Sequence, residues 1–272
     1  MYKMITFDID GTLVPHLSNE LAPEIVDMFK KLKEKNYVVT LATGRDFVSI
    51  ADIYKNPYVD YYIGANGSFI YDLKKEEYIL NSSIKYDDFK KYDKEIIQEN
   101  LFKLKTVILS EPNNVYVKEQ VDKSMDAWFW NSFRFKFKNY ELADTELDRL
   151  HFHLITIEFP EHSNILELTE NFFKKTNSSL CVQAWWPKGM FIANKGITKA
   201  HSIKLLCEKL GIKMKEVIAF GDGENDLEMI NEVGLGIAMG NAVDKLKKIA
   251  DDETIDVKEF GTKFYLEKLG II

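Results

Sequence analysis

Cysteine is scarce in this chain: only Cys181 and Cys207 occur among 272 residues. Two thiols cannot by themselves complete a four-ligand zinc site. Isolated thiols are also typical of proteins from reducing compartments, not of small folds stapled by disulfides. We therefore expect two unpaired cysteines in a fold that depends on neither disulfides nor zinc.

Long apolar runs and an excess of basic residues are also missing. No run approaches the roughly 18 residues that a membrane-spanning helix needs, and the start, MYKMITFDID, lacks the pattern of a signal peptide. Lys and Arg number 36 against 43 Asp and Glu, which gives a net charge of −7. Such a chain has no overall attraction to nucleic acid or to anionic membranes. We expect a cytoplasmic protein with neither partner, and the sequence leaves monomer and homodimer open.

What the chain does have is a globular composition, with 46% hydrophobic and 29% charged residues. Its first eighty residues alternate between strand and helix patterns, which predicts a parallel sheet covered on both faces. The expected elements are a strand at Met4–Asp8, a helix at Pro23–Lys35, a strand at Tyr37–Ala42, a helix from about Asp46 and a strand at Tyr61–Gly64.

The last eighty residues return to the same alternation. The expected elements are helices at Gly196–Leu210, Asn225–Val233, Ala242–Ala250 and Lys263–Leu269, and strands at Val217–Phe220 and Leu235–Met239.

The middle of the chain differs, because aromatic residues and alternating strands dominate it. Phe133, Phe135 and Phe137 alternate with basic residues, Phe152–Phe159 reads as a strand, and Ser163–Lys175 reads as a helix. We therefore predict an α/β fold in two parts. Residues 1–81 and 188–272 form a parallel-sheet core, and residues 82–187 form an inserted α+β domain.

Two carboxylates follow the first predicted strand. Asp8 and Asp10 lie in FDIDGTL, and a two-residue spacing places side chains on the same side of an extended chain. The carboxyl ends of parallel strands are where ligands bind. Carboxylates there can hold a hard cation, act as a nucleophile or transfer protons. The alternative is a solvated acidic turn.

A second acidic cluster, AFGDGENDLEMI, follows another apolar strand. It offers Asp222, Glu224, Asn225 and Asp226, and its alternative is a capped helix start, which Asn and Asp favour. If the two strands are neighbours, the carboxylates of both clusters converge and repel each other unless a cation compensates. That convergence argues for Mg²⁺, which prefers oxygen ligands.

Two further motifs carry weaker signals. In LATGR, the Thr43 hydroxyl and the N–H groups of Thr43 and Gly44 could face an anion at the start of a helix. The alternative is an ordinary strand-to-helix turn. In NKGITKAHS, Lys195 and Lys199 are candidates for a phosphate-binding ammonium, or else are solvated lysines.

In this order, the motifs FDIDGTL, TGR, KGITK and GDGEND resemble those of the haloacid dehalogenase superfamily. The runs at Asn66–Asp72 (NGSFIYD) and Ile237–Ala242 (IAMGNA), with the long insertion between them, resemble its Cof-type branch, subfamily IIB. The resemblance implies a Rossmann-like core and an inserted C2-type cap domain that governs substrate specificity.

The resemblance also implies roles for the acidic residues. Asp8 is the nucleophile and a metal ligand. Asp10 is the general acid and base, and its backbone carbonyl binds the metal. Asp222 completes the metal shell, and Asp226 orients a metal-bound water.

The remaining implied roles concern the substrate. Thr43, Gly44 and Asn225 hold the phosphoryl group. Lys199 matches the motif lysine better than Lys195, because the family places it three residues after the glycine. Asn66 lies near the site entrance.

The function implied is a Mg²⁺-dependent phosphatase that hydrolyses small phosphorylated metabolites through a phospho-aspartate. A phosphotransferase or mutase on the same scaffold, or a non-catalytic phosphometabolite sensor, are the alternatives. Trp128, Trp130, Trp185 and Trp186 could stack on a substrate ring or fill the cap core. His151 and His153 receive no role.

Overall fold

The computed structural model describes residues 1–16, 18–47, 49–50, 52–111, 115–120 and 151–272. Phe133, Phe135, Phe137, Trp128 and Trp130 lie outside these residues. The chain divides into two compact units. The first comprises Met1–Arg45, Ile50–Leu80 and Thr198–Ile272, and the second comprises Asp46–Ser49 and Asn81–Ile197.

The first unit is built on a sheet in the order β13-β12-β11-β1-β2-β3-β4-β5 within the described residues. From β13 to β3 neighbouring strands are parallel, and β4 joins β3 antiparallel. The bounds are β1 Met4–Phe7, β2 Val38–Ala42, β3 Tyr61–Gly64, β4 Phe69–Asp72, β5 Glu77–Asn81, β11 Val217–Gly221, β12 Leu235–Ala238 and β13 Asp252–Glu253.

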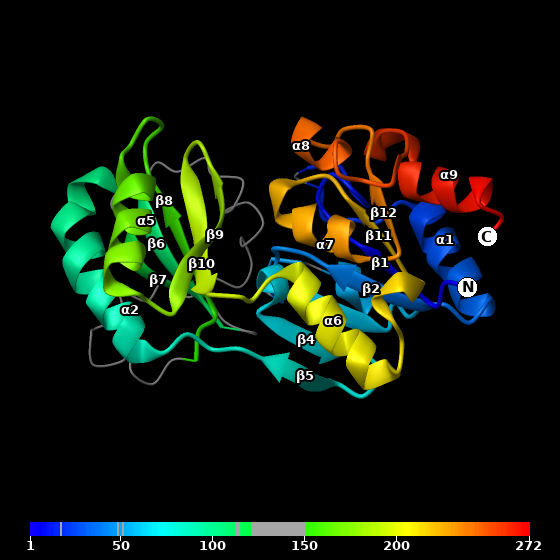
Figure 1. Cartoon of the computed structure of the whole chain (residues 1–272), viewed down its shortest axis with the longest axis horizontal. Coiled ribbons are helices and arrows are strands. Elements are labelled where there is room, and N and C mark those ends of the chain that lie inside the picture. Colours follow the sequence, from blue (N-terminus) through cyan, green and yellow to red (C-terminus); the bar gives the residue numbers. More distant parts are fainter. Residues whose placement is uncertain (17, 48, 51, 112–114, 121–150) are drawn as a thin grey trace. The chain divides into compact units, whose positions relative to one another are not determined.

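Helices cover both faces of this sheet, α1 and α9 on one side and α6 and α7 on the other (Figure 1). The apolar spacing of α1 explains its place, because Ile25, Met28, Phe29 and Leu32 all turn to the core. The bounds are α1 Pro23–Glu34, α6 Lys199–Leu210, α7 Leu227–Glu232, α8 Asp244–Lys247 and α9 Gly261–Lys268.

Strand β1 lies in the middle of the sheet, between β11 and β2. Its side chains are fully buried, as an interior parallel strand requires. Phe7 pairs in register with Phe220 of β11 and Leu41 of β2, and its ring stacks on that of Phe220 at 5.4 Å. The segments after β1, β2 and β11 therefore emerge at one edge of the sheet, where the predicted motifs lie.

The second unit contains an antiparallel sheet in the order β7-β6-β8-β10-β9 within the described residues. Helices α2 and α5 supply Phe89, Tyr92, Phe172 and Phe173 to its core. The bounds are β6 Thr106–Ser110, β7 Val115–Gln120, β8 Leu154–Glu158, β9 Leu180–Trp186, β10 Gly189–Asn194, α2 Tyr86–Tyr92 and α5 Ile165–Thr176.

This architecture confirms the predicted fold class, a parallel-sheet α/β core with an inserted α+β domain. The second unit runs to Ile197, past the boundary that the sequence predicts near residue 188. The reason is β10, which follows that boundary and pairs with β8 and β9.

Three helix predictions need correction. The helix expected at Ala242–Ala250 is reduced to the four residues of α8, Asp244–Lys247, and turns follow it. The helix expected from about Asp46 is wrong, since the described residues there form turns and a 3-10 helix at Ile53–Lys55. Instead, the Asp46 amide donates to the Ser49 hydroxyl and the Ser49 amide donates to the Asp46 carboxylate. Such local side-chain hydrogen bonds to the backbone compete with helix formation. Helix α6 begins at Lys199, not Gly196, because Gly196 has a φ of 80° and Thr198 is the N-cap.

Candidate active site

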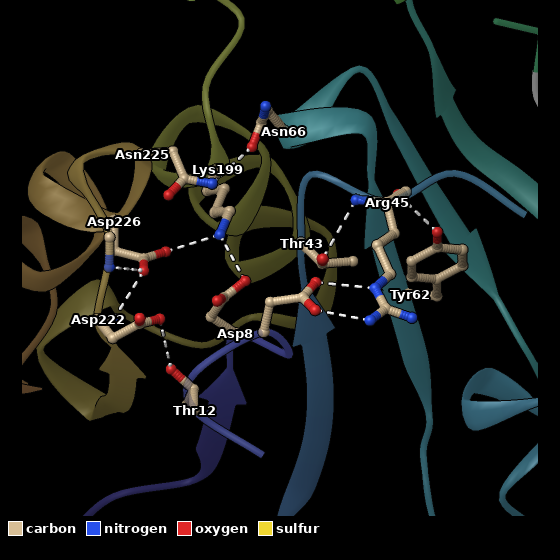
Figure 2. Close-up of polar contacts among 12 residues, drawn as sticks. Asp8, Thr12, Thr43, Arg45, Tyr62, Asn66, Lys199, Asp222, Asn225 and Asp226 are labelled. Carbon is tan, nitrogen blue, oxygen red and sulfur yellow. Dashed lines mark hydrogen bonds and ion pairs between the residues drawn. The ribbon is translucent and has the colours of Figure 1, made fainter. Parts of the chain in front are cut away.

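Asp8 and Lys199 form the centre of the site. Asp8 directly follows β1 and is 5% exposed, and its backbone N–H donates to Phe220 at 3.0 Å. The Lys199 ammonium lies 2.7 Å from Asp8 Oδ1 and 2.7 Å from Asp226 Oδ1 (Figure 2). Its side chain is completely buried, so this ammonium is held in place by the two carboxylates.

The start of α6 places Lys199. The Thr198 hydroxyl accepts a hydrogen bond from the His201 amide at 3.2 Å and caps the helix. Ser202 donates to the Gly67 carbonyl at 2.5 Å, which ties the first turn of α6 to the loop after β3. Lys195, by contrast, is exposed and belongs to the second unit. The structure therefore separates the two lysine candidates.

Asp226 both caps a turn and contacts Lys199. Its Oδ2 accepts hydrogen bonds from the amides of Asp222 and Gly223, both at 3.0 Å. Its Oδ1 accepts from the ammonium. One side chain thus holds the turn after β11 and contacts the ammonium. Asp226 is the N-cap residue of α7, but its side chain makes no cap hydrogen bond to that helix. Glu224 is exposed and is not part of the carboxylate group.

Asp222 joins the two acidic motifs. The Thr12 hydroxyl donates to Asp222 Oδ1 at 3.3 Å. The side-chain Nδ2 of Asn241 donates to the Gly11 carbonyl at 2.8 Å. Gly11 has a φ of 78°, and a Cβ there would strike the Asp222 carboxylate. Only glycine therefore fits at this turn. Thr12 and Asn241 were not predicted as site residues, although Asn241 lies in the quoted IAMGNA run.

Asp10 turns away from this group, toward Arg45. Its Oδ2 accepts from Arg45 Nε at 2.8 Å and its Oδ1 from Nη2 at 2.6 Å. The convergence that the sequence predicts therefore holds for Asp8, Asp222 and Asp226, but not for the Asp10 side chain. The only signal for Arg45 in the sequence is its place in LATGR.

The turn after β2 differs in one respect from the prediction. The Thr43 N–H donates to the Ile63 carbonyl at 3.0 Å, so the expectation that it faces an anion is wrong. Strand β2 ends at Ala42, as predicted, but its hydrogen bonding to β3 continues one residue beyond that end. The Thr43 hydroxyl, which is buried, accepts from the Arg45 amide at 3.2 Å.

Asn66 and Asn225 lie together beside this turn. Asn225 Nδ2 donates to Asn66 Oδ1 at 2.9 Å, and the Asn66 N–H donates to the Thr43 carbonyl at 2.9 Å. The Asn66 carboxamide also packs on Gly44. Four of the five residues that the resemblance relates to phosphate or to the entrance, all but Lys199, are therefore contiguous. Figure 2 shows Thr43, Asn66 and Asn225 of this group.

Negative charge exceeds positive charge around Asp8. Burial raises the pKa of Asp8 well above its ordinary value, and the nearby carboxylates of Asp226 and Asp222 add to this while Lys199 opposes it. Burial also raises the pKa of Asp222. Burial alone would lower the pKa of Lys199, but its two carboxylate partners leave it raised. One ammonium does not balance this group of carboxylates.

The donor atoms fit a hard divalent cation. Carboxylate oxygens of Asp8, Asp222 and Asp226 all lie within 4.8 Å of one another, and all three residues are buried. Buried carboxylates in contact need a compensating cation, and an all-oxygen set suits Mg²⁺ or Ca²⁺ better than a soft metal.

One histidine also reaches this group. His16 Nε2 lies 3.5 Å from Asp222 Oδ2, and that contact raises the His16 pKa. His16 was not predicted as a site residue, because the five histidines show no motif spacing.

The aromatic and histidine candidates of the second unit separate by exposure. Trp185 is 54% exposed, whereas Trp186 packs on Phe191 with ring centroids 4.9 Å apart. His153 is buried and His151 is exposed.

Across the described part of the chain, no helix combines the length and apolar character needed to cross a membrane.

Comparisons with known proteins agree with these motifs. The model of the haloacid dehalogenase-like hydrolase family matches residues 5–263. The chain is 29% identical to an HMP-PP phosphatase from Serratia proteamaculans, over 92% of this chain and 88% of that one. It is 27% identical to a Streptococcus pyogenes protein named as a bifunctional phosphatase/peptidyl-prolyl cis-trans isomerase, over 99% of this chain but only 54% of that longer one.

Solved structures show the same fold. The subclass IIB sugar phosphatase BT4131 superposes with a TM-score of 0.83 at 25% identity, over 99% of this chain and 100% of that one.

Proposed function

This chain belongs to the haloacid dehalogenase-like hydrolase family and is an enzyme of the phosphatase type, and from this premise we propose that it hydrolyses small phosphorylated metabolites through a phospho-aspartate on Asp8. Sugar phosphates or similar esters are the substrate class. The first unit is the catalytic core, and the second is the cap that selects the substrate.

The observation that carries the proposal is the position of Asp8. It lies at the carboxyl end of the central strand, with one oxygen on a buried ammonium and two further carboxylates beside it. A carboxylate can act as a nucleophile toward phosphorus, which explains catalysis without a Ser–His or Cys–His pair. In the proposed reaction, Asp8 attacks phosphorus in line with the leaving oxygen.

Asp10 carries the proton transfers in this mechanism. It gives a proton to the leaving oxygen when Asp8 is phosphorylated, and it takes one from the water that hydrolyses the phospho-aspartate. Lys199 and Thr43 stabilise the charge on the transferring phosphoryl group, because a preorganised ammonium and hydroxyl in a buried site interact strongly with it. Asn225 binds the same group.

Mg²⁺ is the proposed cofactor, held by the Asp8 and Asp222 carboxylates and the Asp10 backbone carbonyl. Bound there, it lowers the repulsion between the anionic nucleophile and the anionic phosphate. Asp226 would orient a water bound to that cation. The same three buried carboxylates that repel each other without a cation support this assignment.

The test is phosphate release from a panel of sugar phosphates, nucleotides, flavin mononucleotide and pyridoxal phosphate, with Mg²⁺ or with EDTA. Asp8→Asn and Lys199→Met are assayed beside the unmodified protein. We expect release that requires Mg²⁺, that Asp8→Asn abolishes, and that Lys199→Met lowers by about 100-fold or more.

Lys195→Met is the matched control, since that lysine is exposed and should leave the rate unchanged. The proposal fails if the folded, unmodified protein releases no phosphate from any member of the panel. It also fails if Asp8→Asn retains full activity.

A further inference from the structure

Arg45 has no role in the mechanism above, yet its side chain and its backbone are both held by several hydrogen bonds. Its side chain is only 6% exposed. Each nitrogen of the guanidinium already donates a hydrogen bond: Nε and Nη2 to Asp10, Nη1 to Asn19 at 2.8 Å, and Nη2 also to the Ser18 carbonyl at 2.9 Å. Figure 2 shows this side chain beside Thr43 and Tyr62.

The backbone of Arg45 is fixed as firmly as its side chain. Its carbonyl accepts hydrogen bonds from the Tyr62 hydroxyl at 2.7 Å and from the Ala65 amide at 2.8 Å, and its N–H donates to Thr43 Oγ1. The guanidinium is therefore held at both ends. Asp10 is the partner with freedom, because its side chain is 27% exposed.

We propose that Arg45 is the positioning residue for proton transfer. The fork formed by its Nε and Nη2 atoms fixes the orientation of the Asp10 carboxylate, and the hydrogen bond from Nη1 to Asn19 holds this fork in place. This inference rests on the proposed function. A planar guanidinium that meets both carboxylate oxygens in parallel sets the rotation of that carboxylate, which a lysine could not do.

The contact leaves Asp10 able to react. Each carboxylate oxygen has two lone-pair sites, so the two hydrogen bonds from Arg45 leave a second site on each oxygen. A leaving oxygen or a water can use that site while the fork holds the group still. Arg45 itself stays out of reach of substrate, because it is buried and all its nitrogens have partners.

The size of the effect follows from geometry. A general acid or base contributes about 10²–10⁴-fold to rate, and a displacement of about 1 Å can cost roughly 10²-fold. Without the two hydrogen bonds from Arg45, the partly exposed Asp10 carboxylate would rotate among orientations. We expect Arg45→Ala to lower kcat for a sugar phosphate by about 100-fold with little change in KM.

A double-mutant cycle with Asp10→Asn tests the coupling. The four proteins are assayed with a sugar phosphate, whose alkoxide leaving group needs a proton, and with 4-nitrophenyl phosphate, whose leaving group does not. The loss of kcat/KM from Arg45→Ala should be smaller for 4-nitrophenyl phosphate, because kcat/KM reports the phosphorylation of Asp8 and not the later hydrolysis, in which Asp10 acts for both substrates. In the Asp10→Asn background, Arg45→Ala should cost nothing further, because it acts through Asp10.

Two more variants protect the test against a general loss of structure. Asn19→Ala retains both Arg45 and Asp10 but removes the acceptor that holds Arg45 Nη1, and we expect it to lower kcat several-fold in the same pattern. Lys33→Met is the control, since it removes another partly buried ion pair, 2.6 Å from Asp60 in the same unit, and should leave kcat unchanged.

Three outcomes would overturn the inference. The first is additive losses from Arg45→Ala and Asp10→Asn. The second is a rise in KM at constant kcat, which would mark Arg45 as a substrate-binding residue. The third is unchanged kcat in Asn19→Ala together with an Arg45→Ala that only unfolds. No release by the unmodified protein is a different result, since it rejects the proposed function and this inference with it.

Discussion

At the scale of the residue, the position of each carboxylate determines what it can do. Asp8 and Asp226 share the Lys199 ammonium, Asp222 meets a hydroxyl, and Asp10 meets a guanidinium. All four follow buried strands of the same sheet. Their different partners explain why the proposed nucleophile and the proposed acid–base residue are different carboxylates, although they are two positions apart.

Burial also raises the pKa of a carboxyl group in the second unit, at a residue that belongs to none of the motifs. Glu158 is 6% exposed at the end of β8, and burial raises its pKa to about 7, against the opposing effect of Lys105. The folded chain therefore keeps a proton that the unfolded chain releases near 4.5. Because the folded state binds more protons between these values, stability falls as the pH rises through about 7.

We expect Glu158→Gln to remove this contribution. From pH 5 to pH 8, the unmodified protein should lose stability relative to the variant, as followed by thermal unfolding with circular dichroism. Glu161→Gln, at an exposed position just beyond β8, is the control and should follow the unmodified protein. Parallel curves for Glu158→Gln and the unmodified protein would contradict the assignment.

At the scale of the element, the turn between β3 and β4 positions the start of α6. Ala65, Asn66 and Gly67 all have positive φ, at 48°, 54° and 101°. Two non-glycine residues in this region store backbone strain, which surrounding contacts must offset. Those contacts are the bonds to Thr43 and Arg45 and the bond from Ser202. The turn thus connects the segment after β2, which holds Thr43 and Arg45, with the helix that begins at Lys199.

Gly67→Ala should therefore impair both stability and catalysis. A Cβ at Gly67 would strike the Thr198 carbonyl and shift the first turn of α6, with the ammonium that it carries. We expect a loss of more than about 2 kcal/mol in the free energy of unfolding, and a fall in kcat of about 10-fold or more. Urea unfolding and steady-state kinetics measure the two effects.

Gly211→Ala is the matched control at the other end of α6. Gly211 also has a positive φ, of 66°, but no atom lies within 4 Å of the position its Cβ would take. It should cost about 1 kcal/mol of stability, from backbone strain alone, and leave kcat unchanged. Equal kinetic effects from the two substitutions would show that the turn does not position Lys199.

At the scale of the whole molecule, the sequence predicts the elements with strong local patterns. Strands such as β1 and β3 are short apolar runs between polar turns, and the periodicity of α1 defines its buried face. The site follows from them, since the motifs stand at strand ends that a parallel sheet brings to one edge. From the residues alone Lys195 and Lys199 remain alternatives. The resemblance to the family favours Lys199, and in the structure Lys199 is buried whereas Lys195 is exposed.

Other features depend on contacts that no local pattern contains. The direction of Asp10 depends on Arg45, which is held by Ser18 and Asn19 from a loop distant in sequence. Strand β10 pairs with β8 and β9 by tertiary register, which composition does not contain, and the second unit runs to Ile197. The Thr43 amide bonds to Ile63 because β2 and β3 are neighbours, a fact of sheet order.

The central claim is that Asp8 carries the phosphoryl group. The most direct measurement is acid quench of the Mg²⁺-loaded protein within one turnover of a sugar phosphate, followed by proteolysis and mass spectrometry of the peptide that contains Asp8. The account predicts one phosphoryl group on Asp8, absent from Asp8→Asn. Rapid turnover with an unmodified Asp8 peptide at every quench time, or the phosphoryl group on another residue, would contradict it.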